Sequence, residues 1–464
     1  MRVLLVDLPA RDGVVSKDTV VGGYGSRLLP FNRVTQVISI LKQRMHDVPS
    51  VHLAYLSGIL AQYGHEVIWS RGERLEADVA IVLSSLVDYK NETAWADQAR
   101  ARGTRVGFIG LTASKLPELF RPHADFLVNG EPESAIQRMA RGARLDGDCH
   151  SEAISDLDTL PFPRWDFASD RPGRWALPFA ARPFGGGIPL LASRGCPEFC
   201  TYCPHRILAA HRSRSVKNIV DELEALCDQF TRPYIIFRDP LFSNDRDRVM
   251  AISDEIRARD LDLRFECETR LDRLDHELLG VLRAAGLRAI SFGVESVSPD
   301  ILKRVGRRPT PEAHQRSVID WCRKNGIVTA AFYVLGFPQD DWNSIAATID
   351  YAIDLGSTAA QFKLLTPYPA TPLWKQLAPR VYETDWEKFD GFTPTFEHPH
   401  LKPAELRFLL GAAYNRFYLR PSYVTDWARV RAKPVRSFMR RMDARVARAH
   451  TRDELATISR AVTC

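Results

Sequence analysis

Residues 196–203 read Cys-Pro-Glu-Phe-Cys-Thr-Tyr-Cys and space Cys196, Cys200 and Cys203 as C-x3-C-x2-C. Three thiolates in one short loop suit a cubane 4Fe–4S cluster and leave its fourth iron without a protein ligand. Such an open iron can bind a small molecule and pass one electron into it. The alternative is a structural zinc site with His205 as the fourth ligand, although zinc sites more often pair two separated C-x2-C knuckles.

The sequence around the cysteines alternates short apolar segments with helical ones. Strands are predicted at 187–193, 234–238, 262–267, 288–293, 327–335 and 359–365. Parallel strands need helical crossovers, so this alternation predicts a partial (β/α)6 barrel. In such barrels the chemistry gathers at the carboxyl ends of the strands. The cysteine loop directly follows the first predicted strand, so the predicted topology and the predicted chemistry agree.

The first 145 residues predict a separate α/β domain. Its short, continuously apolar strands are typical of a parallel sheet covered on both faces. These strands lie at 2–7, 66–69, 78–84, 105–109 and 125–128, with helices near 52–63, 92–102 and 132–141. The pattern indicates a doubly wound, Rossmann-like fold, whose ligand would bind beyond the carboxyl ends of the strands.

Four parts are therefore expected along the chain. The α/β domain at 1–145 is followed by a Pro-rich linker at 146–186, the barrel at 187–385 and a small, mostly helical C-terminal region at 386–464.

Composition limits the class of protein. The chain has 464 residues, 45% apolar and 26% charged, which is ordinary for a soluble globular protein. No apolar run reaches the roughly 20 residues that span a bilayer. The N-terminus does not read as a secretory signal, so reduced cysteines and a cytoplasmic location are expected. Residues 421–464 hold ten Lys/Arg against four Asp/Glu. This basic tail is expected to be a solvated helix face, with peripheral contact to anionic lipid or nucleic acid as the alternative.

The string CPEFCTYC resembles the signature of the radical S-adenosylmethionine (SAM) superfamily. Later motifs are similar to those of the subgroup with an N-terminal cobalamin-binding domain. Those on the barrel are FRDPLFS at 237–243, AISFGVES at 289–296, YVLGFP at 333–338 and TPYPATPLW at 366–374. Those outside it are VNGEPE at 128–133, DLDTLPFPRWDF at 156–167 and AAYNRFYLRP at 412–421. The resemblance covers nearly the whole chain.

The resemblance implies roles for residues at matching positions. The three cysteines would hold the 4Fe–4S cluster, and the backbone of Tyr202 would lie near the adenine of SAM. Asp239 would meet the SAM amino group, although the usual Gly-Gly-Glu is absent here. Glu295 would reach the ribose hydroxyls, and Arg270 would pair with the SAM carboxylate. Gly336 would let the backbone approach the adenosine closely.

Cobalamin is implied by the same resemblance, without an axial histidine from the protein. The string Asp-x-His-x-x-Gly, which supplies that ligand in many corrinoid domains, is absent from residues 1–145. The corrin would then be held at the carboxyl edge of the first sheet by backbone and by small residues such as Ser84, Ser85 and Gly110.

The implied activity is methylation of an unactivated carbon, or of phosphorus, in a small biosynthetic intermediate, through a 5′-deoxyadenosyl radical and methylcobalamin. An external electron donor such as flavodoxin or ferredoxin is also implied. Two alternatives stay open. One is a non-methylating cyclisation or rearrangement on the same fold. The other is tRNA modification, which has less support because nothing after the barrel looks like an RNA-binding module.

Overall fold

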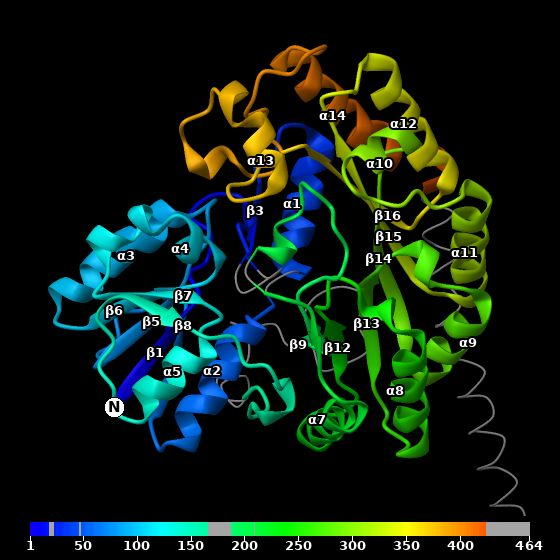
Figure 1. Ribbon diagram of the computed structural model, residues 1–464. Coiled ribbons are helices and arrows are strands. Elements are labelled where there is room, and N and C mark those ends of the chain that lie inside the picture. Colours follow the sequence, from blue (N-terminus) through cyan, green and yellow to red (C-terminus); the bar gives the residue numbers. More distant parts are fainter. Residues whose placement is uncertain (18–22, 46–47, 166–186, 208, 424–464) are drawn as a thin grey trace, which may run out of the picture.

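The computed structural model describes residues 1–17, 23–45, 48–165, 187–207 and 209–423 (Figure 1). The predicted linker beyond residue 165 and the basic tail beyond residue 423 lie outside the described residues. Across the parts of the chain that are described, no helix is long and apolar enough to cross a membrane.

The first sheet is parallel and confirms the doubly wound prediction. Its strands are β1 (Arg2–Val6), β4 (Glu66–Ser70), β5 (Val79–Leu83), β6 (Arg105–Ile109), β7 (Phe126–Gly130) and β8 (Gly147–Ser151). They lie in the order β4-β1-β5-β6-β7-β8. One face packs against α2 (Val51–Gln62) and α5 (Glu133–Ala140), and the other packs against α3 (Tyr89–Ala101).

Several elements of this domain were not predicted. Strand β8 falls in the segment assigned to the linker, because its sequence GDCHS is polar and only Ser151 in it is buried. The hairpin of β2 (Val14–Ser16) and β3 (Ser26–Leu28) is too short to show a periodic signal. Helix α1 (Arg33–Met45) was also not predicted, although Val34, Val37, Ile38 and Leu41 follow a helical spacing. A polar edge strand and a short hairpin bury little apolar surface, so their sequences show little alternation.

The second sheet confirms the partial barrel. Its strands are β9 (Ile188–Leu190), β12 (Tyr234–Phe237), β13 (Arg264–Thr269), β14 (Leu287–Glu295), β15 (Val328–Leu335) and β16 (Ala359–Leu364). All neighbours pair in parallel, and β9 and β16 form the two edges. The crossover helices are α7 (Val216–Gln229), α8 (Arg246–Ala258), α9 (His276–Ala285), α11 (Glu312–Asn325) and α12 (Trp342–Leu355).

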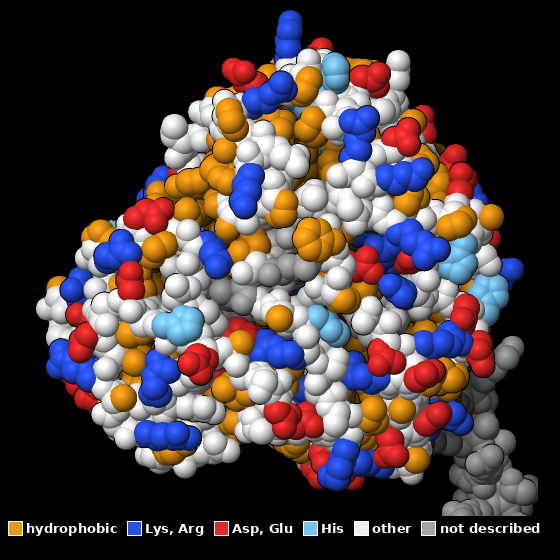
Figure 2. Space-filling model, in the orientation of Figure 1, with side chains coloured by type: hydrophobic (Ala, Val, Ile, Leu, Met, Phe, Trp, Pro, Cys, Tyr) orange, Lys and Arg blue, Asp and Glu red, His pale blue; other side chains and the backbone are white. Residues whose placement is uncertain are grey.

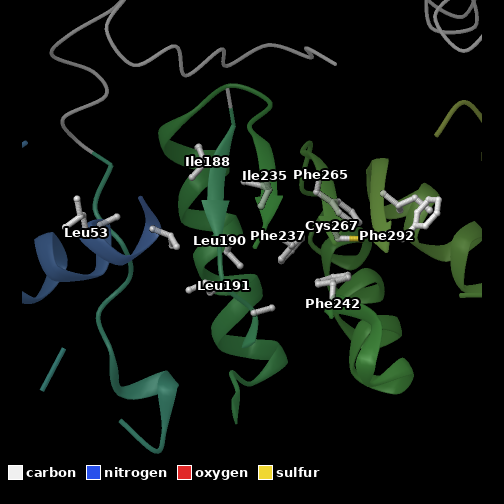
Figure 3. Close-up of a cluster of buried hydrophobic side chains, with 14 of the residues drawn as sticks. Leu53, Ile188, Leu190, Leu191, Ile235, Phe237, Phe242, Phe265, Cys267 and Phe292 are labelled. Atoms are coloured by element: carbon white, nitrogen blue, oxygen red, sulfur yellow. The ribbon is translucent and has the colours of Figure 1, made fainter. Parts of the chain in front are cut away.

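The two faces of this sheet differ in burial. In β13, β15 and β16, buried and partly exposed residues alternate strictly. The buried set includes Phe265 and Cys267, which pack with Phe292 in the core of Figure 3. The partly exposed set on the opposite face includes Glu268 and Lys363. Since successive strand residues point to opposite faces, the inner face of the half-barrel is partly exposed. It carries charged residues on β13 and β16 and apolar residues on β15.

Helix α14 (Pro403–Tyr418) protects the open edge of the barrel. The Tyr418 hydroxyl donates to the carbonyl of Ala360 at 2.7 Å and accepts from its N–H at 3.1 Å. The Tyr414 hydroxyl makes the same pair of contacts with Phe362, at 3.0 and 3.3 Å. Two tyrosines therefore satisfy backbone groups that an unpaired edge strand would leave exposed, which gives the 412–421 motif a structural reason.

One apolar core runs through both units. Leu53 of α2 belongs to the same buried cluster as Ile188 and Leu190 of β9 (Figure 3). The N-terminal domain and the half-barrel are thus packed against each other rather than tethered.

Candidate functional site

The cysteine loop begins at the carboxyl end of the first barrel strand, as predicted. It is bracketed by β10 (Ser193–Arg194), which pairs with β11 (Arg212–Ser213). Gly195 has a φ of +70°, and a Cβ there would lie 2.6 Å from the carbonyl oxygen of Ala209, so glycine is required where the loop starts. The N–H of Thr201 donates to the carbonyl of Val305 at 2.9 Å, which ties the loop to the segment after β14.

The three thiols converge inside this loop. Burial raises the pKa of the Cys203 thiol, and the charges of Cys200 and Cys196 raise it further. The N–H of His205 donates to the Cys203 Sγ and lowers that pKa. Burial also raises the pKa of Cys200, whereas the guanidinium of Arg307, which donates to its Sγ, lowers that pKa. The sulfurs therefore act on one another, and loading a cluster would release their protons. Three converging thiols with hydrogen-bond donors aimed at two of them fit a 4Fe–4S cluster.

The structure does not gather the three thiols and His205 around a single metal ion. Within the described ranges, no group of three or more His, Cys, Asp or Glu side chains is placed to hold a metal ion. A zinc site needs its ligands around one ion. A cubane cluster needs them farther apart, because each cysteine binds a different iron.

Glu295 lies beside the cluster loop, as expected for a SAM ligand. Its φ is +68°, a left-handed conformation that is strained for a non-glycine residue, and the pairing of β14 with β15 shifts register there. Its side chain is buried and accepts a hydrogen bond from Tyr202. Arg307 lies 3.6 Å from the Glu295 carboxylate and also donates to the carbonyl of Gly293.

Arg307 was missed by the sequence analysis. It contacts both Glu295 and the Cys200 sulfur, so it links the expected ribose ligand to the cluster loop. The only sequence signal is a pair of arginines twelve and thirteen residues after Glu295. No known motif spacing identifies such a pair as part of a binding site.

We expect Glu295→Gln to weaken SAM binding about tenfold or more. An amide keeps the shape of the carboxylate but loses the charge-assisted bonds to hydroxyls, which are worth about 1.5–3 kcal/mol. Equilibrium dialysis of SAM against the cluster-loaded protein measures the effect. Glu312→Gln, on the exposed side of α11, is the matched control. An unchanged SAM affinity in Glu295→Gln would remove Glu295 from the binding site.

Asp239 follows β12 and is fully buried. Its carboxylate connects the end of β12 to the residues that follow β9. Its Oδ2 accepts from the N–H of Ala192 at 3.0 Å and its Oδ1 from the Ser193 hydroxyl at 2.5 Å. Burial raises the pKa of this carboxyl, and the bond from Ser193 opposes that shift. These contacts explain the residue structurally, and its role toward the SAM amino group stays a prediction.

Arg270 fastens the cluster loop to the end of β13. Its guanidinium makes a bidentate pair with Asp272 at 2.8 and 2.9 Å and reaches Glu198, inside the cysteine motif, at 3.1 Å. It also donates to the carbonyl of Arg308 at 3.1 Å. Most of its donors are thus taken by protein acceptors, which leaves little for a SAM carboxylate; that role stays a prediction.

Gly336 follows β15 with a φ of +82°. A Cβ added there would lie 3.0 Å from the Leu406 side chain of α14, so the space beside it is filled by protein. The glycine is required by backbone conformation, and close approach of the adenosine stays a prediction.

Gly336→Ala is expected to lower the free energy of unfolding by about 1–2 kcal/mol, because alanine is strained at positive φ. Gly280→Ala is the control: it lies in α9 with open space around it, and is expected to stabilise by about 0.5–1 kcal/mol. Urea unfolding of both variants compares the two. A neutral Gly336→Ala would show that the turn adapts freely.

The three residues expected to hold a corrin lie at the carboxyl edge of the first sheet, as predicted. The Ser84 hydroxyl donates to a carbonyl of β6 and the Ser85 hydroxyl to Glu92, both at 2.7 Å. Gly110 has a φ of +109° and a ψ of 179°, which is glycine-only backbone. Both hydroxyls are thus used inside the domain, and contact with a corrin stays a prediction.

The sequence did not predict the buried ion pair of Lys17 with Glu92. These residues lie 2.8 Å apart at the point where the strand order reverses.

A buried ionic network joins the N-terminal domain to the cluster loop. Arg194, two residues before the first cysteine, pairs with Glu131 at 3.2 Å and with Glu133 at 2.8 Å. Arg212 pairs with Glu131 as well, and Arg194 lies over the ring of Tyr55 at 4.9 Å. The two glutamates are the acids of the 128–133 motif, so that motif holds the start of the cluster loop.

An aromatic cluster separates the carboxyl edges of the two sheets. Tyr24 lies over the first sheet, where its carbonyl accepts from Leu86 after β5. Its ring stacks on Tyr368, after β16, at 5.4 Å, and its hydroxyl donates to the carbonyl of Pro369 at 2.7 Å. The same cluster contains Trp374, Trp386, Phe389 and Ile207 of the cluster-loop region. Both predicted cofactor sites thus border one apolar junction.

Comparison with known proteins agrees with this geometry. Residues 190–352 match the sequence profile of the radical SAM superfamily. An uncharacterized methyltransferase of Pyrococcus horikoshii is 29% identical over 65% of this chain and 68% of its own length. Bacteriochlorophyllide d C-12(1)-methyltransferase of Chlorobaculum tepidum is 26% identical over 69% and 70%.

The fold is shared with a solved structure, the radical SAM methyltransferase TsrM of Kitasatospora setae with cobalamin and a [4Fe-4S] cluster bound. The two superpose with a TM-score of 0.56 at 18% identity, over 88% of this chain and 85% of that one. The converging cysteines at the first strand end, the half-barrel around them and the match over 190–352 lead to one conclusion: this chain is an enzyme that carries a radical SAM domain over those residues.

Proposed function

We propose that this chain is a cobalamin-dependent radical SAM methyltransferase that acts on an unactivated carbon, or on phosphorus, of a small biosynthetic intermediate. One observation carries the proposal: the carboxyl edges of both sheets meet the same aromatic junction, so a corrin on one and a cluster on the other would border one apolar contact. The methyltransferase relatives and the cobalamin bound to TsrM support it.

When bound, the cluster supplies the electron that cleaves SAM and the corrin carries the methyl group. The protein holds and orients these partners. Cys196, Cys200 and Cys203 would bind the cluster, and the Arg194 network fixes their loop against the corrin domain. Glu295 would hold the ribose, and the aromatic junction excludes water from the reacting groups.

The tRNA alternative gains no support from the face shown in Figure 2. On the face shown in Figure 2, basic side chains are interleaved with acidic ones and form no continuous stripe across that face. Binding to a nucleic-acid backbone depends on such a stripe. A small-molecule substrate that binds at the partly exposed inner face of the half-barrel agrees better with this surface.

Methyl transfer is tested with SAM that carries a deuterated methyl group. The protein, loaded with cluster and hydroxocobalamin, is incubated anaerobically with the labelled SAM and titanium(III) citrate. The corrin is then extracted and its mass is measured by mass spectrometry. Arrival of the deuterated methyl on the corrin is expected. A retained corrin that never gains the label, in protein that still cleaves SAM, would favour a non-methylating rearrangement.

A further inference from the structure

The cluster loop reaches the protein surface at Pro197 and Phe199. Phe199, which is bonded directly to Cys200, is 62% exposed, the highest exposure of any large apolar side chain near the site. Cys200 and Cys203 are only partly exposed, and Tyr202 packs inward against Phe337. Because electron tunnelling weakens steeply with distance, the outer side of Phe199 is the natural point for an electron to enter.

Cations line this part of the surface. The segment 303–308, Lys-Arg-Val-Gly-Arg-Arg, has four cations and no acid. It runs along the cluster loop, since a Cβ on Gly306 would lie 2.3 Å from the carbonyl of Phe199 and Val305 accepts from Thr201. The side chains of Lys303, Arg304 and Arg308 are exposed.

The nearby acids are outnumbered. Glu198 is the acid closest to Phe199 in the chain, and it is already paired with Arg270 and Arg273, each at 3.1 Å. Asp272 is bound to Arg270, and Asp300 lies one turn before Arg304 on α10 (Pro299–Arg304). The exposed Lys303, Arg304 and Arg308 make no ion pair with any described residue, so their charge is available to a partner.

We propose that Phe199 and the cations Lys303, Arg304, Arg308 and Arg273 form the docking surface for an acidic one-electron carrier protein of the flavodoxin or ferredoxin class. This rests on the radical SAM function proposed above and adds to it the place where the electron arrives. One electron leaves the reduced carrier and enters the cluster, and no bond forms or breaks in that step. A small apolar contact inside a charged rim suits the weak, fast encounters of electron-transfer partners.

Charge reversal tests the surface. The variant Lys303→Glu/Arg304→Glu/Arg308→Glu is compared with Arg144→Glu/Arg257→Glu, which reverses exposed cations at the amino ends of β8 and of the barrel strands. Stopped-flow bleaching of the cluster gives its rate of reduction by flavodoxin hydroquinone, at low and at high salt. The triple variant is expected to be reduced at least about tenfold more slowly at low salt, with the gap closing as salt screens the charges.

A neutral reductant separates the two proposals. Photoreduced deazaflavin needs no docking surface, so it should reduce wild type and both variants at equal rates and support equal 5′-deoxyadenosine formation. Equal flavodoxin rates in all three proteins, with intact clusters, would overturn the docking surface and leave the proposed function standing. Proteins that bind no cluster and cleave no SAM with deazaflavin would overturn the proposed function and this surface with it.

Discussion

Cys200→Ala is expected to reduce 5′-deoxyadenosine formation to the level of a protein-free control. Cys200 is the central ligand of the three, and its sulfur receives the Arg307 guanidinium. Two remaining thiolates cannot hold a cubane with one open iron, so SAM loses both its anchor and its source of electrons. Iron and sulfide analysis, the visible spectrum of the cluster and a reductant-dependent SAM cleavage assay measure the effect.

Cys149→Ala is the matched control for that variant. Cys149 is half-buried in β8, outside the cluster loop, so its loss should leave iron content and SAM cleavage unchanged. Full SAM cleavage by Cys200→Ala would contradict the assignment of the three cysteines.

Arg194→Leu is expected to destabilise the protein by about 3–5 kcal/mol. The substitution removes the guanidinium that pairs with the buried carboxylates of Glu131 and Glu133. Removing one member of a buried ion pair leaves an uncompensated charge. The same change should loosen the cluster loop against the N-terminal domain and lower cluster occupancy. Chemical unfolding, followed with iron analysis of the reconstituted protein, measures both effects.

The pH dependence of that loss follows from Glu133. Burial alone would raise its pKa, but the Arg194 guanidinium outweighs burial and lowers the pKa below the usual value of 4.5. The stabilisation by this pair is therefore complete above pH 4.5 and is lost as the pH falls through the lowered pKa. The gap between wild type and Arg194→Leu should shrink under acid conditions. Arg257→Leu is the control, because the exposed ion pair of Arg257 with Asp254 contributes little to stability. Its stability difference from wild type should not change with pH.

Most of the fold could be predicted from the sequence because apolar burial follows regular spacing. Strands β1 and β5 and the barrel strands are buried runs or strict alternations, and glycines such as Gly64 mark helix ends. Strand β8 was not predicted because it is polar and mostly exposed. The β2–β3 hairpin was not predicted because strands of three residues are too short to show alternation.

The candidate site was predictable only where chemistry fixes local spacing. The three cysteines lie within eight residues, so one loop brings them together whatever the rest of the chain does. Glu295 was reached through the resemblance, and the structure places it beside Tyr202. Arg307, Arg194 and Lys17 were not found, because their partners lie far away in sequence and only the fold brings them close.

Arg270 and Asp239 have roles that were transferred by position and that stay predictions. Each matches a family position, yet each is engaged by protein groups: Arg270 by Asp272 and Glu198, and Asp239 by the first strand end. Sequence position predicts where a side chain lies more reliably than it predicts the group it binds.

The most direct test of the account is retention of both cofactors by one preparation. The protein is reconstituted anaerobically with iron, sulfide and hydroxocobalamin, passed through gel filtration, and examined by ultraviolet–visible spectroscopy and a SAM cleavage assay. The account predicts corrin bands that stay with the protein near one per chain, together with reductant-dependent 5′-deoxyadenosine. Cleavage of SAM by protein that retains no corrin would contradict the claim that the two sheets hold two cofactors across one junction.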